Sequence, residues 1–293
     1  MGGIDGMAMK TVRKRRVARP SFSLPGDEAA DKSGSVQSVD RALALLEALG
    51  EDEEGYRLTD LAIRTGLSPS TAHRLLATLE QRRFVAFDPG DSTWHVGRQS
   101  FSVGSAFVRR RNFVAPALPF LRRLRDLTHE TANMGVADEG EVVVLTQVES
   151  REIMRAITRV GGRAPMVASG LGKAILATYS NDEVAAIIKR HGMPRLTPRS
   201  VVRAGELRGV LDAVRADGYA VDDEEFLTGL RCVAAAVYND QGEAMAAISV
   251  SGLATRVPER RVSDLGRLVR DVAGELTLAL GGRAPEDSMS RNN

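Results

Sequence analysis

Cysteine is almost absent from this chain, since Cys232 is the only one among 293 residues. A single thiol excludes an intramolecular disulfide framework and a cysteine-rich zinc site. Long hydrophobic runs are absent as well: apolar stretches such as residues 142–145 and 233–237 have the length of strands, not of bilayer spans. The first residues contain no apolar segment typical of a secretory signal. We therefore expect a cytoplasmic protein that does not enter a membrane.

Sequence patterns of enzymes and cofactor sites are also missing. The chain has no phosphate-binding loop, no paired metal-binding histidines and no dinucleotide fingerprint. A nucleophilic cysteine needs a base and a group that lowers its pKa. None of the histidines has a triad-like context: His73, His95, His129 and His191. We therefore expect no enzymatic activity, cofactor or metal, and Cys232 is interpreted as a pocket lining or a small buried hydrophobe.

Positive charge is concentrated near the N-terminus, although the net charge is only +2. Residues 1–34 lack hydrophobic periodicity, and we expect them to be a disordered basic tail. Two compatible interpretations remain open: a solvated leader, or an arm that adds salt-sensitive attraction to phosphate. The basic residues are Lys10, Arg13, Lys14, Arg15, Arg16 and Arg19.

Residues 35–97 have the pattern of a winged helix-turn-helix. Apolar residues recur at helical spacing from Val39 to Leu49, and Gly50 is expected just past the helix end. Thr59 is the expected cap of a second helix that stops at Gly66. The pair Ser68-Pro69 predicts a third helix over 69–81, because Ser caps a helix and Pro fits its first position. Strands at 84–87 and 93–96 flank a turn at 88–92 and predict the wing.

The third helix is the candidate DNA-reading element. Its apolar stripe would pack in a small core, while short polar and basic side chains on the other side could enter a major groove. Hydroxyls near the helix start can bind phosphate, and arginine can pair with guanine. The alternative is a small helical domain with a polar face; Trp94 is expected to pack rather than stack on bases. The candidate DNA contacts are Ser68, Ser70, Thr71, His73, Arg74 and Arg98.

Beyond the wing, the pattern predicts connecting helices and then an α+β domain. Helices are expected at 99–111 and 115–129, with 98–112 as the linker helix and 113–283 as the second domain; residues 284–293 would be a disordered tail. Clustered antiparallel hairpins flanked by helices favour an α+β sensor sheet over alternating βαβ units. Expected strands are 132–137, 142–148, 154–160, 220–222, 232–238 and 244–250. Expected helices are 171–178, 182–191, 206–216 and 258–280.

Motifs in both halves resemble the IclR-type transcriptional regulators. The likeness covers about residues 36–280 and includes 36–43, 58–76, 171–177, 218–225, 229–235 and 247–252. The resemblance implies a winged-helix DNA-binding domain, a linker helix used in dimerisation and a GAF-like effector domain. It also implies homodimers that often pair into tetramers on double-stranded operator DNA.

The second domain contains a candidate effector site. Residues 169–173 mark a helix start, whose free amides can hold a carboxylate, although a plain helix start is the alternative. Ser249 and Ser251 point to one face of a strand, either to solvent or into a pocket. The resemblance extends to glyoxylate-binding repressors of the allantoin pathway and implies a glyoxylate-like effector. It places the carboxylate on Gly170 and Leu171. The aldehyde or hydrate end would meet Asp222, Cys232, Ser249 and Ser251, with Met134 and Leu145 as apolar walls.

Other functions stay open at this point. The effector could be another 2-oxo acid or an aromatic acid, because spacing does not measure pocket volume. The chain could also be an α+β ligand-binding or enzymatic protein whose helical N-terminus only contacts proteins. Whether the regulator represses or activates is not decided by the sequence.

Overall fold

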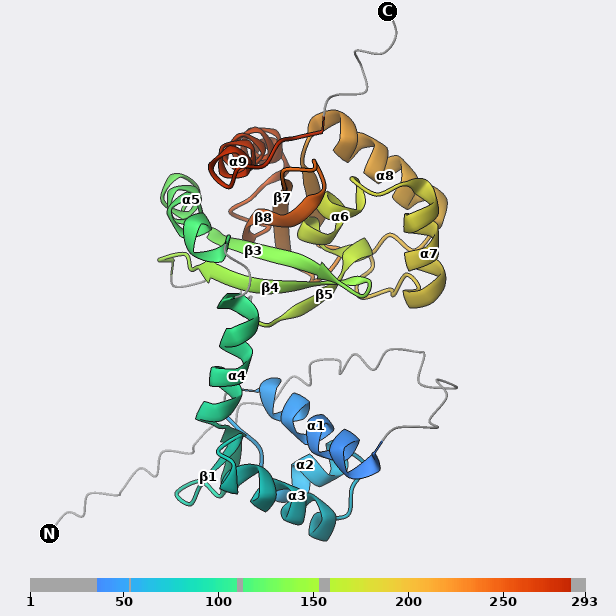
Figure 1. The fold of residues 1–293 in the computed structure, drawn as a ribbon. Helices are drawn as coiled ribbons and strands as arrows, with labels where there is room; N and C mark the ends of the chain where they lie inside the picture. The colour runs from blue at the N-terminus through green and yellow to red at the C-terminus, as the bar shows by residue number, and fades with distance from the viewer. Residues whose placement is uncertain (1–35, 53, 110–112, 153–158, 286–293) are drawn as a thin grey trace, which may run out of the picture.

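The computed structural model describes residues 36–52, 54–109, 113–152 and 159–285. They form a smaller N-terminal and a larger C-terminal part, joined by helix α4 (Arg98–Arg109) (Figure 1). The expected N-terminal tail, residues 286–293 of the expected C-terminal tail and residues 110–112 of the expected linker lie outside these residues. No helix of the described chain has the length and apolar character needed to cross a bilayer.

The N-terminal part packs three helices against a two-stranded wing. Its elements are α1 (Gln37–Gly50), α2 (Leu58–Arg64), α3 (Pro69–Gln81), β1 (Val85–Asp88) and β2 (Thr93–Val96). The strands are antiparallel, and Tyr56 adds a bridge to Trp94 of β2. Trp94 is buried and packs in the core of this part, as expected. The predicted order of a winged helix-turn-helix is therefore confirmed.

Two local predictions in this part are wrong. The second helix begins at Leu58, with extended Arg57 before it and no side-chain cap, so Thr59 lies in its first turn. Gly50 is the last residue of α1 rather than the residue after it. The chain leaves α1 through Glu51 in right-handed helical geometry, so no residue with positive φ is needed there.

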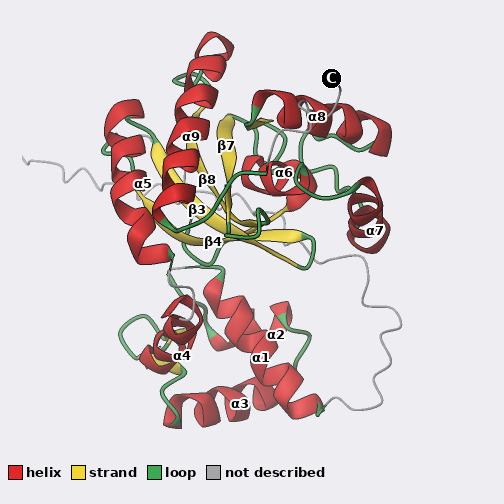
Figure 2. Ribbon diagram, turned by 45° about the horizontal axis from the view of Figure 1, so that its top comes forward, coloured by secondary structure: helices red, strands yellow, loops and turns green. Residues whose placement is uncertain are grey.

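Helix α4 is exposed, whereas α5 (Val114–Thr128) belongs to the C-terminal core. The side chain of Phe101 on α4 is 78% exposed, an unusual position for a large aromatic residue. Helix α5 instead packs beside α9 (Glu259–Ala279) on the large sheet (Figure 2). The expectation that both helices connect the halves is therefore wrong for α5, which buries its apolar stripe.

The C-terminal part is built on one six-stranded antiparallel sheet. The spatial order is β5-β4-β3-β8-β7-β6, so β5 and β6 form the edges. The strands are β3 (Thr131–Asp138), β4 (Glu141–Val148), β5 (Arg163–Pro165), β6 (Ala220–Asp223), β7 (Leu230–Tyr238) and β8 (Ala244–Leu253). Of the strand expected at 154–160, residues 154–158 lie outside the described residues, and the last two are not in a strand; β5 was not expected.

Helices cover both faces of this sheet (Figures 1 and 2). Helices α5 and α9 pack on one face, and α6, α7 and α8 pack on the other. Side chains of a strand alternate between faces, so each central strand serves both cores. The second group comprises α6 (Gly170–Leu176), α7 (Asn181–His191) and α8 (Ala204–Asp217), with a 3₁₀ turn η1 (Met166–Ala168) before α6. The α+β prediction is confirmed.

Candidate functional site

The start of α3 presents polar side chains to the surface. Ser68 caps the helix by accepting a hydrogen bond from the Thr71 amide at 3.2 Å, and Pro69 occupies the first turn. The Ser68 hydroxyl also lies 3.1 Å from that of Ser70. Ala72 and Leu76 hold the opposite side of the helix in the core. The helix is thereby fixed by packing while its polar side stays free for a ligand.

The candidate DNA contacts share this accessible surface. Five of them are exposed, and only Thr71 is half-buried. The exposed ones are Ser68, Ser70, His73, Arg74 and Arg98. Arg98 is the first residue of α4, directly after the wing. A surface of this kind, with hydroxyls at a helix start and basic groups nearby, can contact phosphates and base edges.

The wing turn carries the opposite charge. A cleft of about 920 Å³ lies between this turn and the start of α2. Its lining holds one arginine, Arg57, and an excess of carboxylates: Glu54, Asp60, Asp88 and Asp91. Because like charges repel, this side of the domain disfavours the phosphate backbone. DNA contact is therefore expected to centre on α3 and Arg98 rather than on the wing tip.

The second site lies inside the C-terminal part, on the sheet face that meets α6. Cross-strand pairing puts Asp222 opposite Cys232, and Cys232 opposite Ser251. Ser249, two residues along β8, is opposite Asn133 of β3. Directly opposed residues point to the same face. Four strands thus bring five polar or polarisable side chains together, and all five are buried.

Asn133 was not predicted, and it contacts both serines. Its side-chain nitrogen donates to the Ser251 hydroxyl at 3.2 Å and to the Ser249 hydroxyl at 3.4 Å. The alternation of β3 could have placed Asn133 on one face of its strand. Asn133 and Ser249, however, lie 116 residues apart in the sequence, so their contact could not be read from local patterns.

The start of α6 closes against these strands. Ser169 caps the helix by accepting from the Gly172 amide at 3.1 Å. A Cβ atom at Gly170 would lie 2.9 Å from the Cys232 sulfur, so the glycine lets backbone and thiol approach. The Gly170 backbone therefore lies next to Cys232 on β7.

The expected apolar walls lie elsewhere. Met134 and Leu145 belong to the core under α5 and α9, on the opposite face of the sheet. Met134 follows Asn133 in the strand, so the two side chains must point to opposite faces. The assignment of Met134 and Leu145 to the effector pocket is wrong. Leu171, Val142 and Ile175 are apolar residues of the core on the correct face.

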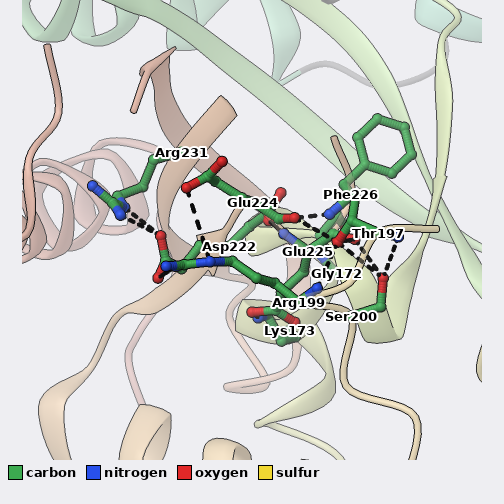
Figure 3. Close-up of polar contacts among 12 residues, drawn as sticks. Gly172, Lys173, Thr197, Arg199, Ser200, Asp222, Glu224, Glu225, Phe226 and Arg231 are labelled. Atoms are coloured by element: carbon green, nitrogen blue, oxygen red, sulfur yellow. Dashed lines mark hydrogen bonds and ion pairs between the residues drawn. The ribbon is translucent and has the colours of Figure 1, made fainter. Parts of the chain in front are cut away.

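A buried ion pair supports the same region. The Lys173 ammonium on α6 donates to Glu225, and the Lys173 side chain is fully buried (Figure 3). The Glu225 amide donates to Asp222 at 2.8 Å, and Ser200 donates to the Glu225 carbonyl at 2.8 Å. The other Glu225 carboxylate oxygen is buried without a hydrogen-bond partner. These contacts fasten α6 to the chain that follows β6, and none of them was predicted.

Burial changes the protonation of two site residues. Desolvation raises the pKa of Asp222 from 3.8 to about 7, against an opposing effect of Lys173. Desolvation also raises the pKa of Cys232 from 9.0 to about 11, with Asp222 adding to the shift. Cys232 is therefore a neutral thiol at pH 7 and a poor nucleophile. Among the described residues, no group of His, Cys, Asp and Glu could hold a metal ion.

Comparison with known proteins assigns both parts of the chain. Residues 38–89 match the IclR helix-turn-helix domain, and residues 105–278 match the bacterial transcriptional regulator IclR C-terminal domain. The acetate operon repressor of Salmonella typhimurium is 40% identical over 260 residues, covering 88% of this chain and 95% of that protein. The repressor AllR of Klebsiella pneumoniae is 36% identical over 263 residues, covering 90% and 97%.

A solved structure agrees with this assignment. The IclR protein of Thermotoga maritima superposes with a TM-score of 0.69 at 25% identity, covering 84% of this chain and 99% of that one. The two family models match the helix-turn-helix part and the sheet domain in the same order along the chain. The resemblance noted in the sequence is confirmed. The chain belongs to the IclR family of bacterial transcriptional regulators, which are not enzymes but bind DNA through a helix-turn-helix and carry an effector-binding domain.

Proposed function

We propose that this regulator binds operator DNA as a dimer or a dimer of dimers, and that a small 2-oxo carboxylate, best represented by glyoxylate, changes its DNA affinity. The observation that carries the effector proposal is the burial of Asp222, Cys232, Ser249 and Ser251 on one sheet face beside the start of α6. Residues 35–97 would bind DNA, 98–112 would link, and 113–283 would bind the effector.

The proposed ligand lies between helix and sheet. The Gly170 and Leu171 amides would hold its carboxylate, because the first amides of a helix lack intrahelical partners. The four strand residues would surround the aldehyde or hydrate with donors and acceptors. The close approach of Gly170 to the Cys232 sulfur leaves no room for a side chain at residue 170, so the helix backbone can come close to the strand residues.

The proposed DNA contacts are the exposed residues of α3 and Arg98. Ser68, Ser70 and Thr71 would bind phosphate near the helix start, while His73 and Arg74 would reach base edges or phosphates. The basic segment before residue 20 could add attraction to the duplex that does not depend on sequence.

Two exposed apolar surfaces support a dimer. On α1, Val39 and Leu43 are each 55% exposed, and on α4, Phe101 and Phe107 are 78% and 50% exposed. Residues of this kind on neighbouring helices are typical of a surface that a partner covers. We propose that a second copy of the chain covers α1 and α4. An effector can then act only by binding two dimer arrangements with different affinity.

The test of the effector site is the double variant Ser249→Ala/Ser251→Ala. Calorimetry with glyoxylate should show binding to the wild type and none to the variant, while a gel shift with promoter DNA is unchanged. A variant that binds glyoxylate as tightly as the wild type would dispose of this site. A thermal-shift screen with other 2-oxo acids and aromatic acids identifies the effector if the wild type does not bind glyoxylate.

A further inference from the structure

Asn133 has a position in the effector site that the assignments above do not use. It is 1% exposed and lies in β3, directly opposite Ser249 on β8. Strand β8 separates it from Cys232 on β7. Its amide nitrogen reaches both serine hydroxyls of β8, at 3.2 and 3.4 Å. A single side chain therefore contacts both serine hydroxyls, and one of these serines, Ser251, is paired directly with Cys232.

Counting donors shows what this contact does. An asparagine NH₂ group has two hydrogens and can give one to each serine oxygen. A serine hydroxyl has one hydrogen and two acceptor positions. Once its oxygen accepts from Asn133, the hydroxyl hydrogen of Ser249 or Ser251 is left to donate to another atom. Ser249 and Ser251 partly offset the raised pKa of Cys232, as hydroxyls directed toward its sulfur would.

We propose that Asn133 is a positioning residue of the effector site, because its amide orients the Ser249 and Ser251 hydroxyl hydrogens away from β3, toward Cys232 and the bound effector. The site thereby selects ligands that present an acceptor oxygen to the two serines, as an aldehyde or its hydrate does. This inference rests on the proposed function for the identity of the ligand, but the hydroxyl orientation does not depend on any ligand.

A neighbouring residue supplies a matched control. Thr131 lies two residues earlier in β3, on the same face and equally buried, opposite Ser251. Its hydroxyl accepts from the Ser150 amide at 3.1 Å. The substitution Thr131→Val removes a buried hydrogen bond of the same strand without removing the Asn133 amide. If Asn133→Ala weakened ligand binding only because the protein became less stable, Thr131→Val should weaken it as well.

The first measurement compares two ligands by calorimetry. Acetate has the carboxylate of glyoxylate but a methyl group in place of the aldehyde. We expect Asn133→Ala to weaken glyoxylate binding about tenfold, the effect of about one hydrogen bond, and to change acetate binding little. Thr131→Val should leave the ratio of the two affinities unchanged. An equal loss for both ligands in Asn133→Ala would mean a structural role and overturn the proposal.

The second measurement needs no ligand. Because Cys232 is the only cysteine, the infrared S–H stretching band reports its hydrogen bonding alone. In the isosteric variant Asn133→Asp, the new oxygen accepts from the serines and turns their hydrogens toward β3. We expect the frequency of the S–H band to shift in Asn133→Asp and in Asn133→Ala, and to be unchanged in Thr131→Val. Thermal unfolding checks that each variant is folded.

The two measurements separate two kinds of failure. If the wild type does not bind glyoxylate but the band moves as expected, the effector assignment is wrong and the role of Asn133 stands. If the band is the same in wild type, Asn133→Asp and Asn133→Ala, Asn133 does not orient the hydroxyls. The inference is then overturned even if glyoxylate binds.

Discussion

The two sites of this protein differ in how their residues are brought together. The candidate DNA surface comes mainly from one stretch, Ser68 to Arg74, and nearly all of it is exposed. The candidate effector site draws on four strands and a helix, between Asn133 and Ser251, and all of it is buried. Exposed charges act in water and are screened, whereas buried polar groups depend on their partners. Substitutions in the first site should therefore change binding, and substitutions in the second should change stability as well.

The largest effect is expected where a buried charge loses its partner. Lys173→Met leaves the Glu225 carboxylate unpaired in the interior and should lower the free energy of unfolding by about 3–5 kcal/mol. Urea denaturation measures this loss. The control is Lys189→Met on α7, where the lysine is exposed, and it should change stability little. Adding Glu225→Leu to Lys173→Met should recover much of the loss; if it lowers stability further, the unpaired charge is not the cause.

At the exposed site we expect a loss of binding without a loss of stability. Arg74→Ala should weaken operator binding about tenfold or more, because a paired contact from arginine to a base contributes about 1–3 kcal/mol. Fluorescence titration with promoter DNA measures the affinity, and thermal unfolding checks the fold. Arg208→Ala, at an exposed position on α8, should bind DNA as the wild type does. Equal affinities for Arg74→Ala and the wild type would remove Arg74 from the DNA surface.

The pH dependence of ligand binding should distinguish the buried site from the exposed one. The pKa of Asp222 is raised to about 7, so its carboxyl group is neutral and can donate below that pH, and is charged above it. An anionic effector should therefore bind about tenfold more weakly at pH 8 than at pH 6, since affinity falls with the protonated fraction. The raised pKa of Asp222 also affects folding. It stabilises the folded protein fully at a pH below the unfolded pKa of this group, and this stabilisation is lost as the pH rises through about 7. Calorimetry on Asp222→Asn should show a flat profile; a wild-type profile that is already flat would contradict this assignment.

The smallest effect is expected at the wing tip. Asp91→Lys replaces a carboxylate of the acidic cleft by a cation and should tighten DNA binding about two- to fivefold at low salt, the range of an exposed charge interaction. The gain should shrink as salt is added, because exposed charges are screened. Asp182→Lys, on the exposed start of α7, is the matched charge change in the other part of the chain. If Asp182→Lys tightened DNA binding by a similar factor, the gain would come from the net charge of the protein and not from the position of Asp91 on the wing.

The DNA-binding part was largely predictable because its signals are local. The Ser68-Pro69 pair determines where α3 starts. The Ser68 hydroxyl accepts from the amide three residues later, so the signal lies within four consecutive residues. Thr59 shows the limit of that argument. A residue able to cap a helix does so only if the chain is extended at that position, and here the extended residue is Arg57.

For the candidate effector site, the sequence supplied residues only where resemblance or strand alternation gave the information. Alternation puts Ser249 and Ser251 on one face, but it does not say which strand lies beside them. Asn133 was therefore missed, as was Glu225, whose partner Lys173 is 52 residues away in the sequence. Met134 was misplaced for the same reason, because its face became clear only once β3 was paired with β8.

Gly172 couples the position of α6 to that of η1. A Cβ atom at this position would lie 2.3 Å from the Met166 Cα, so α6 and η1 touch backbone to backbone. With no flexible side chain between them, neither can slide past the other, and a ligand that displaces α6 must displace η1 too. Since η1 follows β5 directly, such a displacement would reach the outer edge of the sheet, where β5 is paired on one side only, with β4, among the residues that the structure describes.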